Sequence, residues 1–295
     1  MGFIDGVPRA RLGRPPTPVV VVPFIALAWL ALFLFLRANE SRIVFMTERT
    51  HSPGVRIDGT VFHRVRFPTS DGLRLEGIHL ESTAAWPYWI LFCPASGTTI
   101  HMTEVQEQLR ALQSFGYGVL SFDYRGFGVN AGEPSEDGVY VDAESAYAYL
   151  TRILRVPPTR VILAGRSLGS AVAVELATRV KVAGLVLFSP IDSVPLTGAR
   201  LYPLFPVRHF ARHQFDNLAK VSRLQSPVVV VSGTADQMVP IDVARSLFEK
   251  IPRPKLMIET TASHDDAGFN RGAQLLDALT RFWPPTLTTT NAPLE

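Results

Sequence analysis

The stretch Gly165-Arg166-Ser167-Leu168-Gly169 decides the fold of this chain, because a short apolar run, Val161–Ala164, precedes it and a helix-forming run, Ser170–Ala177, follows it. A serine between two glycines on such a strand-to-helix turn is the sequence form of a nucleophile elbow. Glycine is expected wherever a side chain would collide with the neighbouring strand and helix. Ser167 is therefore predicted to stand at the top of a parallel sheet, beside a helix N-terminus whose free N–H groups can hold an oxyanion.

The composition sets the class of protein. A chain of 295 residues with 47% hydrophobic and 19% charged residues suits one large α/β domain or two small ones. A net charge of +3, with the arginines scattered, argues against nucleic acid as a partner. The single cysteine, Cys93, excludes an intrachain disulfide and a cysteine-based metal cage. We interpret Cys93 as a buried residue at a strand end, and we expect no metal and no organic cofactor.

The N-terminal region is predicted to be a membrane anchor. Val19–Leu36 carries no charge and is long enough to cross a bilayer as a helix that rises roughly 1.5 Å per residue. Its length, and the absence of a small-residue cleavage site at Phe33–Arg37, favour an uncleaved anchor over a signal peptide. A run that is apolar all round at the end of a chain also favours a membrane span over a core helix.

The charges beside this anchor bear on its orientation. Arg9, Arg11 and Arg14 precede it, which favours a cytoplasmic N-terminus and an extracytoplasmic catalytic domain. The arginines on the other side, Arg37 and Arg42 among them, nearly balance this bias.

The rest of the chain reads as one catalytic domain. Two alternating runs, 61–67 and 73–80, flank a short turn and predict a β-hairpin. Strands and helices then alternate, which predicts a parallel sheet with helices on both faces. A proline-rich apolar stretch at about 190–226 interrupts the alternation and is predicted to form a lid insertion. The expected parts are a flank at 1–18, an anchor at 19–36, a linker at 37–60, a catalytic domain at 61–283 and a disordered tail at 284–295.

A serine hydroxyl needs a base to take its proton and an acid to orient that base. In an open α/β sheet such groups gather at the carboxyl ends of the strands. His264 follows the expected strand at 255–259 and is the only histidine in a loop after a late strand, so we expect it to be the base. His101, which begins the helix after Cys93, is near enough to line a site but precedes the serine.

Two aspartates compete for the role of the acid. Asp236 follows the expected strand at 228–232 and gives the chain order serine, acid, histidine, which is the order expected on this sheet. Asp192, just past the expected strand at 182–188, is the alternative. We prefer Asp236 because its surrounding sequence is the better turn.

An oxyanion hole needs two N–H donors. The backbone N–H of Leu168 is the first candidate. The second should come from the loop after the expected strand at 89–93, where we favour the N–H of Ala95, with Ser96 as the neighbouring candidate.

Several motifs together resemble one branch of the α/β-hydrolase superfamily, the membrane-anchored "alpha/beta hydrolase domain-containing" serine hydrolases. The similar stretches are Asp123-Tyr124-Arg125-Gly126-Phe127-Gly128, Gly165–Gly169, Phe188-Ser189-Pro190, Gly233-Thr234-Ala235-Asp236 and His264-Asp265. The resemblance implies the α/β-hydrolase fold behind an N-terminal anchor. It also implies an association with depalmitoylation and carboxylester cleavage. We interpret Asp123 and Arg125 as a structural network that holds the loops of the site.

The chain departs from this branch at the oxyanion loop, where Cys93-Pro94-Ala95 stands in place of His-Gly-Asn. Because the expected donor is a backbone N–H, Ala95 can still supply it, whereas Pro94 has none.

The predicted function is a membrane-anchored serine hydrolase that cleaves an acyl ester or thioester of a small or lipid-like substrate through an acyl-enzyme. A serine amidase or peptidase is an alternative, and so is a catalytically idle fold that acts as a membrane-tethered binding protein. Dehalogenation or epoxide opening would need a carboxylate at the elbow, and Ser167 argues against both.

Overall fold

The computed structural model describes residues 18–47, 61–82, 88–264, 266 and 272–284. The chain divides into two compact units, Met1–Glu40 and Ser41–Glu295. Of the predicted tail at 284–295, residues 285–295 lie outside the described residues, as do residues 1–17 of the predicted flank at 1–18.

The first unit contributes most of helix α1 (Pro18–Phe45). The part of α1 from Pro23 to Phe45 is long and apolar enough, by length and composition, to cross a membrane, and none of the residues in its apolar stretch of 18 is buried. The structure corrects the linker that was predicted from residue 37, because residues 37–45 continue the helix. Neither proline nor glycine occurs between Leu36 and Phe45, so nothing in that stretch ends the helix.

The last turn of α1 belongs to the second unit and packs inside it. Phe45 is fully buried, and its ring meets the Phe215 ring edge-on at 5.9 Å between centroids. Ser41 Oγ lies 3.0 Å from His213 Nε2, and the Phe45 carbonyl accepts a hydrogen bond of 2.9 Å from the Gly97 N–H. The second unit therefore begins at residue 41, and not at residue 61 as predicted for the catalytic domain.

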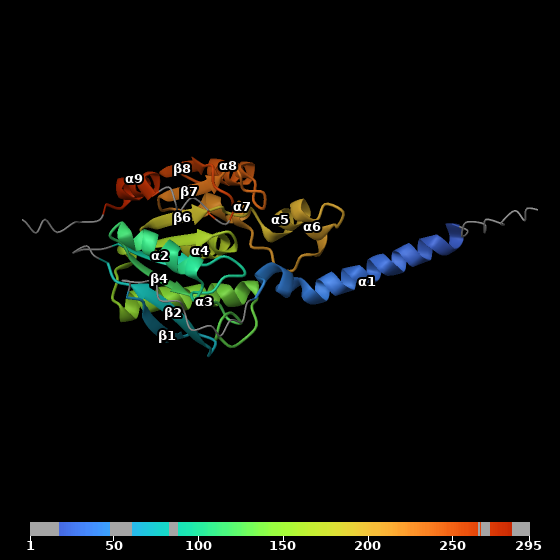
Figure 1. The fold of residues 1–295 in the computed structure, drawn as a ribbon, viewed down its shortest axis with the longest axis horizontal. Helices are drawn as coiled ribbons and strands as arrows, with labels where there is room; N and C mark the ends of the chain where they lie inside the picture. The colour runs from blue at the N-terminus through green and yellow to red at the C-terminus, as the bar shows by residue number, and fades with distance from the viewer. Residues whose placement is uncertain (1–17, 48–60, 83–87, 265, 267–271, 285–295) are drawn as a thin grey trace, which may run out of the picture. The chain divides into compact units, whose positions relative to one another are not determined.

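An eight-stranded sheet forms the centre of this second unit (Figure 1). Its order is β1-β2-β4-β3-β5-β6-β7-β8, with β2 antiparallel to β1 and β4 and all the later neighbours parallel. The strands are β1 (His63–Pro68), β2 (Arg74–Leu80), β3 (Trp89–Cys93), β4 (Gly118–Phe122), β5 (Val161–Arg166), β6 (Gly184–Phe188), β7 (Val228–Gly233) and β8 (Lys255–Thr260). The predicted hairpin and mostly parallel sheet are confirmed.

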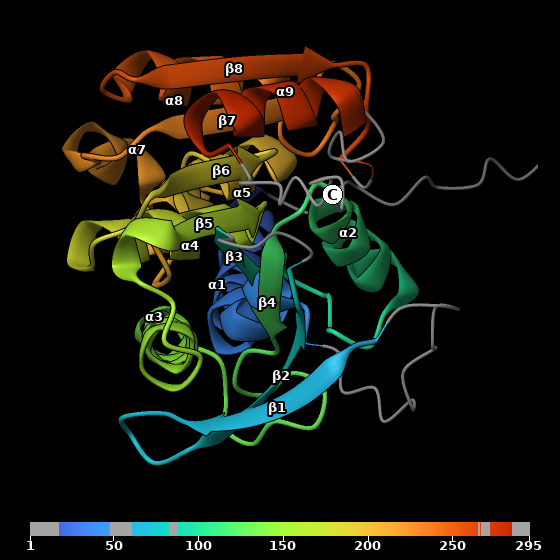
Figure 2. The same cartoon turned by 90° about the vertical axis from the view of Figure 1, so that its left-hand side faces the viewer.

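Helices cover both faces of the sheet, as the alternating pattern predicts (Figure 2). One core lies between the sheet and helices α3, α4 and α8, and the other lies between the sheet and α2 and α9. These helices are α2 (Thr103–Ser114), α3 (Glu136–Ala148), α4 (Leu168–Arg179), α8 (Ile241–Lys250) and α9 (Gly272–Phe282). Helix α3 changes after Ala148 into a π-helix, Tyr149–Ile153.

The insertion between β6 and β7 consists of short helices rather than sheet. It contains α5 (Val194–Leu201), α6 (Val207–Phe210) and α7 (Asn217–Lys220), and α5 and α6 extend beyond the layers of the sheet (Figure 1). The Ser193 side chain caps α5, and the Asp216 side chain caps α7. The whole segment leaves the sheet at the carboxyl end of β6, which is the edge where β5 also ends.

Candidate active site

Ser167 occupies the turn between β5 and α4 with a φ of +51° and a ψ of −118°. A positive φ is rare for a residue with a side chain and costs about 1–3 kcal/mol unless the surroundings enforce it. Here the glycines on either side allow a very close approach of the backbone. A Cβ at Gly165 would stand 2.2 Å from the Gly169 carbonyl oxygen, and a Cβ at Gly169 would stand 2.1 Å from that of Cys93. The turn thus has the geometry of a nucleophile elbow.

Two hydrogen bonds join three side chains that are distant in sequence. His264 Nε2 lies 3.1 Å from Ser167 Oγ, and His264 Nδ1 lies 2.8 Å from Asp236 Oδ2. With a carboxylate at Nδ1, the hydrogen-bond network assigns the imidazole proton to Nδ1, which leaves the Nε2 lone pair facing the serine hydroxyl. The arrangement can therefore accept the hydroxyl proton.

Asp236 is held in place by the turn that follows β7. Its Oδ1 accepts hydrogen bonds from the Val239 N–H at 2.7 Å and from the Met238 N–H at 3.0 Å. Burial alone would raise the pKa of this carboxyl, but the hydrogen bonds from His264 and Val239 outweigh burial and lower the pKa below its usual value. Asp236 is thus a fixed negative charge beside the imidazole.

The alternative acid and the alternative histidine are occupied elsewhere. Asp192 forms an ion pair with Arg200 of α5, with both nitrogen–oxygen distances at 2.8 Å, and it accepts a hydrogen bond from the Ser193 N–H. His101 Nε2 lies 3.2 Å from a Glu76 carboxylate oxygen on β2. The structure brings Asp236, and neither of these residues, to His264.

The loop after β3 contacts the elbow at the predicted oxyanion position. Ala95 is buried and Ser96 is half-buried in the turn that follows it. A Cβ at Gly169 would stand 2.4 Å from the Pro94 carbonyl oxygen, so the start of α4 and the loop are in direct contact. The N–H of Leu168, at the first turn of α4, has no acceptor four residues earlier within that helix.

Two contacts that the sequence reasoning missed hold this loop. The Tyr124 hydroxyl donates a hydrogen bond of 3.1 Å to the Pro94 carbonyl, which belongs to the same planar peptide unit as the Ala95 N–H. Burial raises the pKa of Tyr124 well above its usual value, so its hydroxyl stays protonated and remains a donor. The second contact is the bond from the Gly97 N–H to the Phe45 carbonyl at the end of α1. The first contact thus holds the peptide unit that carries the Ala95 N–H, and the second holds the turn that follows it.

A buried arginine, also missed, joins the elbow to the histidine loop. Arg166 is the last residue of β5, and its guanidinium donates to the His264 carbonyl at 3.1 Å and to a Glu104 carboxylate oxygen on α2. Its position between the glycine and the serine of the elbow gives no hint of this role. The one available signal is a charged residue at the end of an otherwise apolar, fully buried strand.

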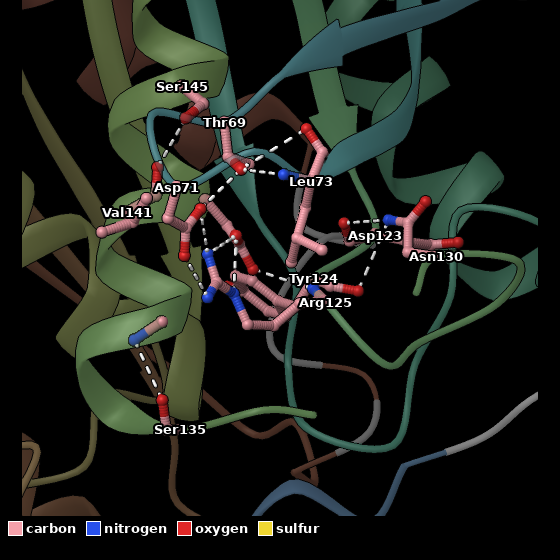
Figure 3. A network of polar contacts seen from close by, with 12 residues as sticks. Thr69, Asp71, Leu73, Asp123, Tyr124, Arg125, Asn130, Ser135, Val141 and Ser145 are labelled. Carbon is pink, nitrogen blue, oxygen red and sulfur yellow. Dashed lines mark hydrogen bonds and ion pairs between the residues drawn. The ribbon is translucent and has the colours of Figure 1, made fainter. Parts of the chain in front are cut away.

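The loop from Asp123 to Asn130 carries a network of polar contacts (Figure 3). Arg125 forms ion pairs with Asp142 at 2.8 Å and with Asp71 at 2.7 Å. These contacts agree with the interpretation of Arg125 as structural. The arginine hydrogen bond lowers the pKa of Asp71 to about 2, whereas burial raises the pKa of Asp142 despite the same partner.

Asp123 ties this loop to the segment after β3. Its Oδ1 accepts a hydrogen bond of 2.7 Å from the Ile100 N–H, and its carbonyl accepts one of 2.6 Å from the Asn130 amide (Figure 3). Burial raises the pKa of Asp123 to about 7, and the nearby Glu76 adds to the rise.

The single cysteine is not placed for nucleophilic chemistry. Cys93 is fully buried, and burial raises the pKa of its thiol, which makes it a poor nucleophile. Within the part of the chain that the structure describes, no group of three or more histidine, cysteine, aspartate or glutamate residues could hold a metal ion.

Comparisons with known proteins place the chain in a family. The model of the alpha/beta hydrolase family matches residues 90–289. The chain is 32% identical over 269 residues to the Mycobacterium tuberculosis protein Rv2307c, which covers 90% of this chain and 95% of that one. It is 30% identical over 217 residues to the human alpha/beta hydrolase domain-containing protein 17B, which covers 72% of each chain.

Solved structures share the fold. The Pyrococcus furiosus esterase Pf2001 superposes with a TM-score of 0.67 at 19% identity, over 80% of this chain and 98% of that one. The esterase domain of a Rhodothermus marinus protein gives a TM-score of 0.59 at 22% identity, over 75% of this chain and 99% of that one. The chain has the sheet and the elbow described above, and the family model spans most of the second unit. This chain therefore belongs to the alpha/beta hydrolase family.

Proposed function

We propose that this protein is a membrane-anchored serine hydrolase that cleaves an acyl ester or thioester through an acyl-enzyme. One observation carries the proposal, namely the unbroken chain of hydrogen bonds from Ser167 through His264 to Asp236. Membership of the alpha/beta hydrolase family and the likeness to esterases support a hydrolase activity.

In the acylation step, Ser167 Oγ attacks the carbonyl carbon of the substrate while its proton passes to His264 Nε2. Asp236 stabilises the resulting imidazolium and keeps the ring in its orientation. The tetrahedral intermediate then collapses, the bond to the leaving oxygen or sulfur breaks, and His264 returns the proton to that leaving group. The acyl group stays on Ser167 as an ester.

The oxyanion of the tetrahedral intermediate is held by the N–H of Leu168 and the N–H of Ala95, with the Ser96 N–H as the neighbouring alternative. The first donor lies at the N-terminus of α4, where the helix dipole favours negative charge. The loss of one such donor typically lowers kcat by about 10²- to 10³-fold.

In the deacylation step, His264 takes a proton from water, and the resulting hydroxide attacks the acyl-enzyme carbonyl. The same two N–H groups hold the second oxyanion. Collapse of this intermediate releases the carboxylic acid and returns the proton to Ser167 Oγ.

The substrate class follows from the surroundings of the site. The apolar insertion and the anchor helix favour an acyl chain that is lipid-like and close to a bilayer. On the basis of the arginines that precede the anchor, we assign the catalytic unit to the extracytoplasmic side. If a protease-cleavable tag at the C-terminus is protected from protease added to sealed spheroplasts, the assignment to the extracytoplasmic side is wrong.

A fluorophosphonate probe tests the nucleophile, because it reacts with an activated serine only. We expect labelling of the native chain, no labelling of Ser167→Ala and normal labelling of the matched control Ser121→Ala, whose buried hydroxyl bonds to the Phe92 carbonyl in the core. If none of the three is labelled, the proposal is wrong and the chain is an idle fold used for binding.

A panel of esters, thioesters and amides of graded acyl length then tests the bond that is cleaved. We expect turnover of esters or thioesters that depends on chain length. Turnover of amides alone would replace the proposed activity with that of an amidase.

A further inference from the structure

The insertion presents apolar side chains and positive charge to solvent. Leu204 is 81% exposed, Tyr202 51%, Leu201 45% and Phe210 42%, and the exposed Arg208 lies among them. We call these five residues the insertion surface. Residues 200–213 include no aspartate or glutamate, and of their three arginines Arg200 is paired with Asp192. A soluble protein rarely exposes large apolar side chains together unless the surface meets a partner.

The base of the insertion lies where the chain enters the second unit. His213 and Phe215 contact Ser41 and Phe45, in the last turn of α1. Ser41 is only five residues beyond Leu36, where the uncharged run ends, so covalent geometry keeps it within about 18 Å of that run, at roughly 3.6 Å per residue. This limit holds at any angle between the two units.

The same turn also approaches the site. The Phe45 carbonyl accepts the Gly97 hydrogen bond, and Gly97 lies two residues after the proposed donor Ala95. If α1 spans a bilayer, the base of the insertion and the loop of Ala95 therefore both contact a helical turn that lies only a few residues beyond the membrane-spanning run.

We infer that the insertion surface docks on the interface of the bilayer in which α1 is anchored, with Arg208 against anionic lipid headgroups. The inference rests on the proposed membrane anchoring. Apolar side chains interleaved with arginine, and without acidic residues, are the composition of elements that lie in the headgroup region of a membrane. The docked insertion places the proposed acyl site at the level from which a lipid-like acyl group can enter.

Site-directed fluorescence on the full chain in vesicles tests the docking. Because Cys93 is fully buried, Leu204→Cys can be labelled selectively with bimane. The matched control is Ile153→Cys, at a position that is 65% exposed at the end of the π-helix, on the side of the amino ends of the parallel strands and opposite the elbow. We expect bromine-labelled lipids to quench the probe at 204 at a depth of about 5–10 Å below the headgroups and to leave the probe at 153 unquenched.

Charge is tested by comparing vesicles of phosphatidylcholine with and without phosphatidylglycerol. We expect Arg208→Glu to reduce the lipid quenching at 204 only when the anionic lipid is present. Equal quenching of both probes by aqueous iodide, with none by the lipids, would overturn the inference and point to a protein partner for this surface.

Two readouts on the same vesicles separate this inference from the proposed function. Resistance to alkaline carbonate extraction reports the anchor, and fluorophosphonate labelling reports Ser167. A chain that passes both tests but leaves Leu204 in water refutes the docking alone. If alkaline carbonate releases the chain from the vesicles, the proposed anchor is wrong, and so is the docking that depends on it.

Discussion

Tyr124→Phe is the substitution that examines the oxyanion loop most directly. It removes one hydroxyl, which donates a hydrogen bond of 3.1 Å to the Pro94 carbonyl. The ring stays buried between Phe122 and Phe127. The substitution touches none of the atoms proposed to react. Its effect on the rate must therefore come through the peptide unit that carries the Ala95 N–H.

The expected size follows from the contact that is lost. A buried carbonyl left without its partner costs about 1–3 kcal/mol, and the removal of a whole oxyanion donor lowers kcat by about 10²- to 10³-fold. Tyr124→Phe keeps the donor but frees its peptide plane to tilt. We expect kcat to fall by about 5- to 30-fold, which corresponds to about 1–2 kcal/mol.

Kinetics with a soluble chromogenic ester measure this effect. The Ala95 N–H meets a charge only in the transition state, so KM should stay nearly constant while kcat falls. Affinity for a boronic acid, which mimics the tetrahedral intermediate at Ser167, should fall by a similar factor.

Tyr117→Phe is the matched control, because it deletes a buried tyrosine hydroxyl that donates to a backbone carbonyl, that of Trp283, at 2.7 Å. That contact lies between β4 and the end of α9, far from the elbow in sequence and on the opposite core. We expect it to lower Tm comparably and to leave kcat unchanged. A kcat of Tyr124→Phe within about twofold of the native value would refute the proposed role of the Tyr124 hydroxyl.

Three further predictions concern the acid, the histidine loop and a buried charge. Asp236→Asn should lower kcat by about 10³- to 10⁴-fold, because an amide at Nδ1 favours the wrong imidazole tautomer, whereas Asp192→Asn should change kcat only a few-fold; the reverse order would assign the acid to Asp192. Arg166→Ala should lower kcat by about tenfold at constant KM, since the loop of His264 loses its tie, and Arg166→Lys should recover part of the loss if the role is positioning. Asp123, whose pKa is raised to about 7, keeps in the fold a proton that the unfolded chain releases near pH 4, so its contribution to stability is lost as pH rises from about 4 to about 7. In thermal melts, the free energy of unfolding of Asp123→Asn relative to that of the native chain should therefore rise over that range, by up to about 2–4 kcal/mol. A difference between the two chains that is constant with pH would contradict this.

The fold was predictable from the sequence because its signals are local. The alternation of apolar runs with helical runs, and the turn at Thr69–Gly72, each act over a few residues, and together they predict a hairpin followed by parallel strands. The elbow was predictable for the same reason, because close backbone approach admits only glycine at 165 and 169.

The end of α1 was not predictable in this way. Residues 37–45 lack an apolar period, so they resemble a linker, and their helix is stabilised at its end by the burial of Phe45 against residues far along the chain. Tertiary contact decides the boundary there, and local propensity does not.

The choice between two acids shows what sequence order leaves open. Asp192 and Asp236 both follow parallel strands, β6 and β7, that end at the same edge of the sheet, and order along the chain allows either to face His264. The difference lies in the segment after each strand. After β6 the chain leaves the sheet for the insertion, where Arg200 neutralises Asp192. After β7 the chain turns back at once, and the amides of Met238 and Val239 hold the Asp236 carboxylate toward β8 and the loop that carries His264. Asp192 is thus bound within the insertion by Arg200, and Asp236 is the aspartate that contacts His264.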